Sequence, residues 1–367
     1  MMPILRPTIA EVDLKKLARN MRKVHEQAGV GVRVLTVLKA NAYGHGAVPL
    51  GLFLEKNKLS DFFGAASVEE ALQLRQVGVT LPILVLGSIY PFEAFEYAIK
   101  NNIAITIASL DAAKAVCEIA EKLGKKALCH VKQDTGMGRI GTRRGGVFNV
   151  IEYLDKNPHV ILDGLFTHLS SVETDPAYTE EQIGYYRDTL TNVHLKGIHI
   201  NYCHVAASAA ITARPDVHYD MVRTGHSALG LEPGFEPILS LKTRVVYVKD
   251  VPAGASISYN RSFIAPSAMK VATLPLGYGD GYLRALSNKA EVLINGKRCR
   301  VLGNITMDML MVDITNAGPV KVGDEAVAVG RQGDEEITYA ELAEKAGTID
   351  YELCTLLMPR VPRIYKE

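Results

Sequence analysis

The chain has 367 residues, of which 48% are hydrophobic and 22% are charged, values that are ordinary for a globular protein. Its 41 Lys and Arg residues balance 40 Asp and Glu residues, and the formal net charge of +1 gives no reason to expect a nucleic-acid partner. No stretch approaches the ~18 consecutive apolar residues of a membrane span, and the N-terminal residues lack the basic and apolar regions of a secretion signal. A cytosolic enzyme of two domains, or of one large barrel with an appendage, is therefore expected.

The cysteine content also indicates a cytosolic protein. There are five of them, an odd number, widely scattered and without a CxxC pair: Cys117, Cys129, Cys203, Cys299 and Cys354. This pattern argues against a disulfide framework and against a zinc site, and it fits a reducing cytoplasm. We therefore expect a cytoplasmic protein with no structural metal.

The first two thirds of the chain alternate between short apolar runs and helical segments. Asp13 is placed to cap a first helix, and later segments such as 68–77 and 110–123 are also helix-like. The apolar runs occupy residues 34–38, 62–66, 83–86, 103–107, 127–131, 161–166, 198–202 and, more weakly, 221–222. Runs without alternation are typical of strands buried on both faces, and eight strand–helix repeats predict an α/β fold, a (β/α)8 TIM-type barrel. An open doubly wound sheet is the alternative, but no glycine fingerprint follows the first run.

From Pro237 onward the pattern becomes that of β structure. Residues 241–251 are rich in branched side chains, and Asn295-Gly296 separates two apolar runs as in a tight hairpin. Further short strands are expected at 312–314 and 326–329, with a single late helix over 339–345. We therefore predict a barrel over residues 1–238 and a mostly antiparallel β domain over residues 239–367. For residues 1–10, packing on the second domain is an alternative to packing on the barrel.

Lys39 is the first candidate for chemistry. It follows the first apolar run in VLKANAYGHG, which places it at the carboxyl end of a barrel strand, where active sites of barrels lie. A partly desolvated lysine has a lowered pKa and can form a Schiff base. From position alone, a solvated lysine that simply ends a strand is the favoured interpretation.

The whole string resembles the segment of alanine racemases in which a lysine binds pyridoxal 5'-phosphate. The resemblance extends along most of the chain in further motifs, in the family's order: KQDTGMGRIG, GLFTHLSS, HVAASAA, VRTGHSALG, SISYNRSF, LPLGYGDGY, GNITMDM and RVPRIY. The family fold, a barrel followed by a β domain, agrees with the organisation predicted above. The resemblance implies racemisation of L-alanine and D-alanine, with D-alanine supplied to cell-wall peptidoglycan.

The resemblance also implies the residues that hold the cofactor. Besides Lys39 they are Tyr43, His168, Ser208, Arg223, Gly225 and His226. Arg223 matches the arginine that faces the pyridine nitrogen. Because arginine keeps its proton, the ring nitrogen stays unprotonated and withdraws less charge, which favours racemisation over transamination. Gly225 and Ser208 follow the last two barrel strands, the usual phosphate site of such barrels.

Racemisation needs a base on each face of the substrate. By resemblance Lys39 serves one face and Tyr259 the other, with a nearby cation, Arg139 or His168, lowering the pKa of the tyrosine. Arg139 matches the arginine that orients the substrate carboxylate, and Lys132 matches a lysine that some relatives carry as a carbamate. In the family the tyrosine comes from the partner subunit, together with residues that match Tyr278, Met307 and Asp308. The resemblance therefore implies a homodimer with shared active sites.

Several positions depart from the family pattern. Ala207, Leu229 and Asn260 replace residues that are asparagine, tyrosine and glycine in many relatives, and CTLLMPRVPR carries one extra residue with no match for a second phosphate-binding tyrosine. These changes bear on substrate breadth and cofactor affinity more than on reaction class. The alternatives are a serine or broad-specificity racemase of the same fold and, from another class, a pyridoxal-phosphate homeostasis protein without turnover. A membrane or nucleic-acid partner is not expected.

Overall fold

The computed structural model describes residues 5–143 and 145–367, which form two compact units. The barrel unit comprises residues 18–42 and 47–228, and the β unit comprises the described residues up to 17 together with 43–46 and 229–367. Helix α1 (Leu14–Ala28) begins in the β unit and continues into the barrel unit. Its first turn is capped as predicted, because the Asp13 carboxylate accepts a hydrogen bond from the Lys16 amide at 2.9 Å.

A parallel sheet forms the centre of the barrel unit. Among the described residues it has eight strands, in the order β8-β7-β6-β5-β4-β3-β2-β9. They are β2 (Arg33–Val37), β3 (Phe62–Ala65), β4 (Ile83–Val85), β5 (Ile103–Ile107), β6 (Ala127–Lys132), β7 (Val160–Phe166), β8 (Tyr202–His204) and β9 (Met221–Thr224). Every residue of β3, β4 and β5 is buried, as expected of strands covered on both faces. A bridge between Ala207 and Arg223 joins the two ends of the sheet. The predicted barrel is confirmed.

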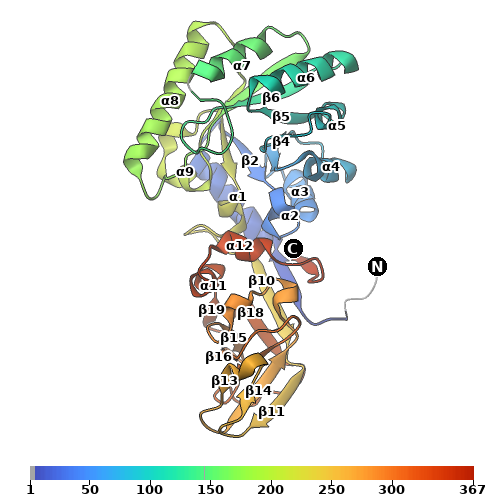
Figure 1. Ribbon diagram of the computed structural model, residues 1–367, viewed down its shortest axis with the longest axis vertical. Coiled ribbons are helices and arrows are strands. Elements are labelled where there is room, and N and C mark those ends of the chain that lie inside the picture. The colour runs from blue at the N-terminus through green and yellow to red at the C-terminus, as the bar shows by residue number, and fades with distance from the viewer. Residues whose placement is uncertain (1–4, 144) are drawn as a thin grey trace. The chain divides into compact units, whose positions relative to one another are not determined.

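Helices surround this sheet (Figure 1). They are α3 (Ala47–Lys56), α4 (Val68–Gln76), α5 (Ala94–Lys100), α6 (Leu110–Leu123), α7 (Gly145–Asp155), α8 (Pro176–Leu195) and α9 (Ser208–Ala213), with the short η1 (Pro215–Val217) and α10 (His226–Leu229) near β9. Capping explains the bounds of α6. Ser109 accepts a hydrogen bond from the Ala112 amide at the start of α6, and Gly124 ends that helix in the left-handed conformation.

The seventh barrel strand lies further along the chain than predicted. The strand expected at 198–202 is β8, at Tyr202–His204. The apolar Ile198 belongs instead to the end of α8, because its amide donates to the Val193 carbonyl after the left-handed Gly197. Such a contact closes a helix, and it accounts for an apolar residue that the sequence pattern assigns to a strand.

The β unit contains a mixed sheet in which strands are paired mainly antiparallel. In the described part of the chain its main path is β11-β14-β17-β16-β15-β18-β10-β1-β20, with β19 paired to β18. The strands are β1 (Ile9–Asp13), β10 (Leu239–Arg244), β11 (Tyr247–Val251), β14 (Met269–Leu274), β15 (Glu291–Ile294), β16 (Lys297–Leu302), β17 (Leu310–Asp313), β18 (Glu325–Gln332), β19 (Glu335–Ile337) and β20 (Arg363–Lys366). A separate pair is formed by β12 (Ser256–Ile257) and β13 (Phe263–Ile264). The predicted antiparallel β domain is confirmed.

Two local features of the β unit were not predicted, and a third concerns the N-terminal residues. The run at 241–251 is two strands, since β10 pairs with β1 and β18 whereas β11 pairs with β14. Strand β1 pairs with β10 and β20, and residues 1–4 before it lie outside the described part of the chain. The expectation of one late helix is wrong: α11 (Tyr339–Ala346) is followed by α12 (Asp350–Thr355), a helix too short to show a periodic pattern. Short 3-10 turns complete the unit, namely η2 (Tyr259–Arg261), η3 (Tyr278–Asp280) and η4 (Arg284–Leu286).

Candidate active site

Lys39 begins a left-handed turn directly after the first barrel strand. In α2 (Lys39–Tyr43), Ala40, Asn41 and Ala42 have φ angles of 50°, 55° and 51°. Each non-glycine residue in this conformation costs about 1–2 kcal/mol. The Glu70 carboxylate supports the turn, accepting hydrogen bonds of 2.7 Å from the amides of Ala40 and Ala66. Backbone strain of this kind clusters at functional sites.

The surroundings of Lys39 favour its neutral, nucleophilic form. Burial lowers the pKa of its amine, the nearby positive charge of Arg139 lowers it further, and Glu70 acts in the opposite direction. A neutral amine is the form that attacks a carbonyl carbon. The structure therefore places at this strand end a lysine suited to covalent chemistry.

Arg223 lies in β9 with only 5% of its surface exposed. Its Nη2 donates to the carbonyls of Thr167 and Val205 at 2.8 and 2.9 Å, and its Nη1 donates to the carbonyl and to Nδ1 of His204. Burial lowers the pKa of the guanidinium to about 10. Arg223 is therefore rigidly held and still carries its positive charge at neutral pH.

His168 follows β7 and lies beside Arg223. Burial, followed by the positive charges of Arg223 and Lys132, lowers the pKa of the His168 imidazole to about 2. The ring is therefore neutral at physiological pH. The expectation that His168 serves as a cation for Tyr259 is wrong, because burial and, after it, the neighbouring positive charges keep the ring unprotonated. Arg139 is left as the candidate for that role.

Hydroxyl and amide groups converge after the last two barrel strands. Ser208 Oγ, at the start of α9, accepts hydrogen bonds from the amides of Gly225 at 3.2 Å and Ser227 at 3.4 Å. His226 begins α10 between them. Ser227 Oγ is buried and has no hydrogen-bond partner among the described residues. Donors gathered at strand ends and an orphaned hydroxyl fit the recognition of a phosphate group.

Lys132 ends β6 and is 3% exposed. Its Nζ lies 4.3 Å from the centroid of the Phe166 ring. Burial, then the charges of Arg223 and Arg139, lower the pKa of the amine well below its usual value, while Asp134 acts in the opposite direction. Arg139 is exposed in the loop that follows. That loop is fixed by the Asp134 carboxylate, which accepts hydrogen bonds from the amides of Gly136 and Gly138.

Tyr43 belongs to the β unit, where it lies beside Tyr351 of α12. Their ring centroids are 6.0 Å apart. The following Gly44 contacts the Cys354 carbonyl so closely that a side chain at this position would collide with it, and its own carbonyl accepts a hydrogen bond from Arg363 at 3.0 Å. Tyr351 was not a sequence candidate, because it lies before the segment in which a second tyrosine was sought.

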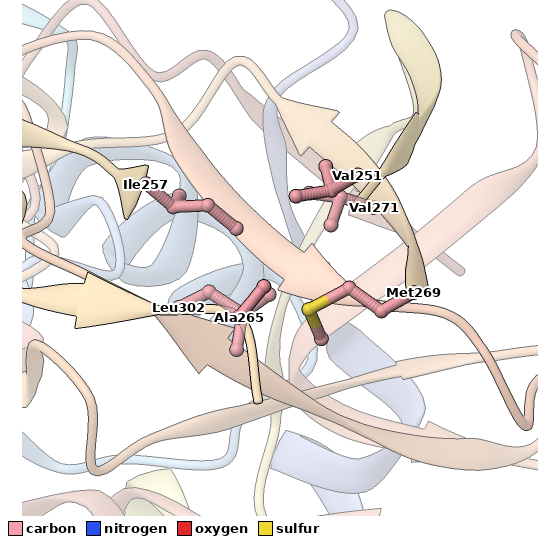
Figure 2. Packing of buried hydrophobic residues seen from close by; sticks show 6 residues of the cluster. All are labelled: Val251, Ile257, Ala265, Met269, Val271 and Leu302. Carbon is pink, nitrogen blue, oxygen red and sulfur yellow. The ribbon is translucent and has the colours of Figure 1, made fainter. Parts of the chain in front are cut away.

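Tyr259 projects from the turn between β12 and β13 and is 69% exposed. The flanking Ser258 and Asn260 have φ angles of 68° and 60°, which makes this turn strained. Asn304 holds it, donating through Nδ2 to the Tyr259 carbonyl at 2.8 Å. Beneath the turn lies a buried apolar cluster, shown in Figure 2: Val251, Ile257, Ala265, Met269, Val271 and Leu302. A well-packed base therefore presents an exposed tyrosine.

Tyr278, Met307 and Asp308 meet in the same unit. The Tyr278 amide donates to Thr306 and the Gly279 amide to Met307, so that two loops are joined side by side. Arg360 links them further, pairing with Asp308 at 2.8 Å and with the fully buried Asp280 at 2.8 Å. The structure thus brings together three of the sequence candidates, 41%, 53% and 57% exposed in order. Asp280 and Arg360 were missed by the sequence analysis.

Family models match both units. The model described as the alanine racemase N-terminal domain covers residues 12–233, and that of the alanine racemase C-terminal domain covers residues 238–365. The chain belongs to the alanine racemase family. Members of this family are isomerases that act on amino acids, and the chain is such an enzyme.

Full-length relatives agree with this assignment. The chain is 42% identical over 370 residues to an alanine racemase of Symbiobacterium thermophilum, covering 98% of this chain and 97% of the relative. An alanine racemase structure from Clostridium difficile 630 superposes with a TM-score of 0.93 at 38% identity, covering 100% and 97% of the two chains. A second structure of the C. difficile enzyme, in complex with cycloserine, has a TM-score of 0.92 at 37% identity with the same coverage.

The structure adds residues that the sequence motifs did not single out. His204, which binds Arg223, stands within the motif HVAASAA, but the strand predicted at 198–202 ended before it, whereas β8 includes it. Glu70 carries no motif of its own and is revealed only by its two backbone hydrogen bonds. Within the described residues, no helix combines the length and apolar character that crossing a membrane requires.

Proposed function

We propose that this enzyme interconverts L-alanine and D-alanine with pyridoxal 5'-phosphate as cofactor. The observation that carries the proposal is the buried, charged Arg223 at a barrel strand end, in a chain whose full-length relatives are alanine racemases. Lys39 supplies the amine to which an aldehyde cofactor attaches. The complex of a C. difficile relative with cycloserine, a small amino-acid analogue, supports a small amino acid as substrate.

The residues present fit this cofactor. Ser208, Gly225 and His226 follow the last barrel strands, near the orphaned Ser227 hydroxyl, and would hold the phosphate, to which Tyr43 would also contribute. His168 and Arg223, which lie beside each other, would face the ring of the cofactor. When bound, the cofactor withdraws electrons from the α-carbon of the substrate and so acidifies its proton. Arg223 offers only N–H donors and keeps its charge, which limits this withdrawal and favours return of the proton to the α-carbon.

Two bases move the proton. The neutral amine of Lys39 takes or returns it on one face of the substrate, and Tyr259 of the partner subunit serves the other face. Arg139 orients the substrate carboxylate and lowers the pKa of the tyrosine. Burial, which lowers the pKa of the Lys132 amine, favours the form that adds to carbon dioxide: the nitrogen lone pair bonds to the carbon, one C=O π bond opens to the carboxylate, and an N–H proton leaves to solvent. The resulting carbamate braces Arg139.

The enzyme works as a homodimer with shared active sites. Tyr259, Tyr278 and Met307 are large side chains exposed on the β unit. Apolar and aromatic groups exposed together mark an interaction surface, and tyrosine combines an apolar body with a polar tip. Each subunit therefore contributes this surface, with Asp308, to the substrate pocket of the other. The two domains, predicted over residues 1–238 and 239–367, correspond to the barrel unit and the β unit, except that the described residues up to 17, 43–46 and 229–238 group with the β unit.

The product serves cell-wall synthesis. D-alanine made by this reaction enters peptidoglycan precursors, and the enzyme works in the cytoplasm. The five cysteines are all free thiols, which is typical of proteins in a reducing compartment. Nothing in this proposal calls for a nucleic acid or a membrane.

The experiment that tests the proposal is chiral chromatography of single L-amino acids incubated with the purified enzyme and cofactor. We expect L-alanine to approach an equal mixture of enantiomers faster than L-serine or L-lysine does. A Lys39→Ala variant is the inactive control. If L-serine is converted faster than L-alanine, serine and not alanine is the preferred substrate. If the protein binds the cofactor and converts no amino acid, it is a cofactor-carrying protein without turnover.

A further inference from the structure

A line of polar side chains leads from Arg223 into the barrel wall. Arg223 Nη1 lies 2.8 Å from Nδ1 of His204. Guanidinium nitrogens only donate, so Nδ1 of His204 accepts, and the single proton of this neutral ring is on Nε2. Burial, followed by the charge of Arg223, lowers the pKa of His204 well below its usual value, which keeps the ring neutral.

The next ring continues the line in the same direction. His204 Nε2 lies 3.0 Å from Nδ1 of His130 and donates to it. Nδ1 of His130 therefore accepts, and its proton is on Nε2. That nitrogen lies 3.4 Å from Oδ2 of Asp163, whose Oδ1 accepts a hydrogen bond of 2.8 Å from Asn201. The hydrogen bonds of Arg223 and His204 thus run in the direction of one carboxylate. Nε2 of His130 is buried and makes no hydrogen bond within the described residues, and it faces that carboxylate at ion-pair distance.

The backbone is built to place that carboxylate. The pairing of β6 with β7 shifts register between Cys129 and His130: Cys129 lies opposite Leu162, but His130 lies opposite Gly164. Asp163 is the extra residue of this β-bulge, and bulges next to active sites re-aim side chains. A Cβ at Gly164 would lie 2.7 Å from Cγ of His130, closer than ordinary contact allows. Because glycine has no Cβ, the imidazole fits against β7.

Arg223 needs such a partner. Its described acceptors are carbonyl oxygens and imidazole nitrogens, and no carboxylate of the described residues lies within ion-pair distance of it. A buried charge without a compensating partner is costly. Asp163, with 13% of its side chain exposed, is reached through the two imidazoles. Stacking of His204 on Phe166, with centroids 4.7 Å apart and planes 3° from parallel, fixes the ring between them.

We propose that Asp163 is the remote counter-charge of Arg223, and that His130 and His204 transmit its field by holding fixed tautomers. The three are positioning residues: they keep the guanidinium protonated and aimed out of the barrel wall. The proposal that the guanidinium points toward a pyridine nitrogen rests on the proposed function. The contacts that link Arg223 to Asp163 do not depend on the proposed function.

The test is nuclear magnetic resonance of the full-length protein labelled with ¹⁵N-histidine, with His130→Gln and His204→Gln used to assign the signals. In the wild type, both rings are expected to be neutral with the proton on Nε2. Asp163→Asn, which keeps the shape and removes the charge, is expected to shift the signals of both rings. Asp216→Asn, an exposed acid beside Arg214, is the matched control and is expected to shift neither.

A proton on Nδ1 of either ring in the wild type would overturn the proposal, and this measurement needs no variant to fold. An Asp163→Asn spectrum in which only His130 shifts would overturn the transmission to His204. Racemase activity of the wild type is assayed on the same samples. The predicted tautomers without racemisation would support this inference and refute the proposed function, whereas racemisation with other tautomers would do the reverse.

Discussion

Nδ1 of His168 lies 3.5 Å from Nη2 of Arg223, so that an imidazole directly faces a buried guanidinium. This contact, with burial as the larger cause, explains why the pKa of His168 lies at about 2. A histidine in this position cannot act as an acid at neutral pH. It can accept a hydrogen bond, and its ring can exclude water from the site proposed for the pyridine ring of the cofactor.

The depressed pKa of His168 makes the folded protein sensitive to acid. Below the unfolded value of about 6.5 the unfolded state binds one more proton, which lowers the free energy of unfolding by about 1.4 kcal/mol per pH unit. His168→Gln removes this dependence. The Tm deficit of the variant relative to wild type is therefore expected to shrink from about pH 7 to about pH 5. The exposed His194→Gln serves as the control. A deficit that stays constant with pH would show that His168 takes up a proton in the folded state over the same pH range as in the unfolded state, and would contradict the low pKa.

Replacing Lys39 tests the cofactor attachment. Lys39→Ala removes the amine at the end of β2, and the visible absorption band of the cofactor bound to lysine is expected to disappear while the fold persists. Lys126→Ala, at an exposed position before β6, is expected to keep the band. Absorption spectra of the purified variants, with circular dichroism as the check on folding, decide the outcome. A Lys39→Ala protein that retains the band would assign the attachment to another lysine.

Tyr259→Phe tests the two-base scheme. Loss of a positioned general base typically lowers the rate by about 10²–10⁴. We expect that loss for proton removal from one alanine enantiomer and a much smaller one for the other, because Lys39 still serves its own face. Exchange of the α-proton with deuterium oxide, measured separately for each enantiomer, reports both. Tyr247→Phe, another exposed tyrosine of the β unit, is the control. Equal small effects on both enantiomers would contradict the scheme.

The sequence predicted most of the barrel because its strands are buried on both faces. Runs such as 103–107 consist of apolar residues and one threonine, and β5 has those bounds. Prediction failed where an apolar residue has another task, as Ile198 does in closing α8, and where an element is as short as α12.

Site residues carried by motifs, such as Lys39 and Arg223, could be predicted, whereas their supports could not. Glu70, His130 and Asp163 act through backbone amides, a β-bulge and a facing glycine. These relationships depend on strand register, and a one-residue shift of register is invisible in a linear pattern of apolar residues. The supports of a site therefore need the structure even where its chemistry is legible in the sequence.

Mixing two inactive variants tests the shared active sites. In a heterodimer of Lys39→Ala and Tyr259→Phe chains, one of the two sites combines an intact Lys39 with an intact Tyr259. Random exchange makes half of the dimers mixed, so about a quarter of wild-type activity is expected. Each variant mixed with itself is the control. Mass spectrometry of the intact dimers verifies that subunits have exchanged. If no activity returns after verified exchange, each site is contained in one subunit.

The central claim is that the charge of Arg223 directs the reaction toward racemisation. It is tested most directly by the ratio of D-alanine to pyruvate formed from L-alanine by the wild type and by Arg223→Glu, with cofactor binding verified in both. A carboxylate at this position would hold a proton on the ring nitrogen of the bound cofactor and strengthen electron withdrawal. This would favour transamination, in which the amino group of alanine passes to the cofactor and one pyruvate is released per cofactor. We expect D-alanine alone from the wild type, and slower racemisation with measurable pyruvate from the variant. A variant that binds cofactor and racemises like the wild type, without pyruvate, would contradict the account.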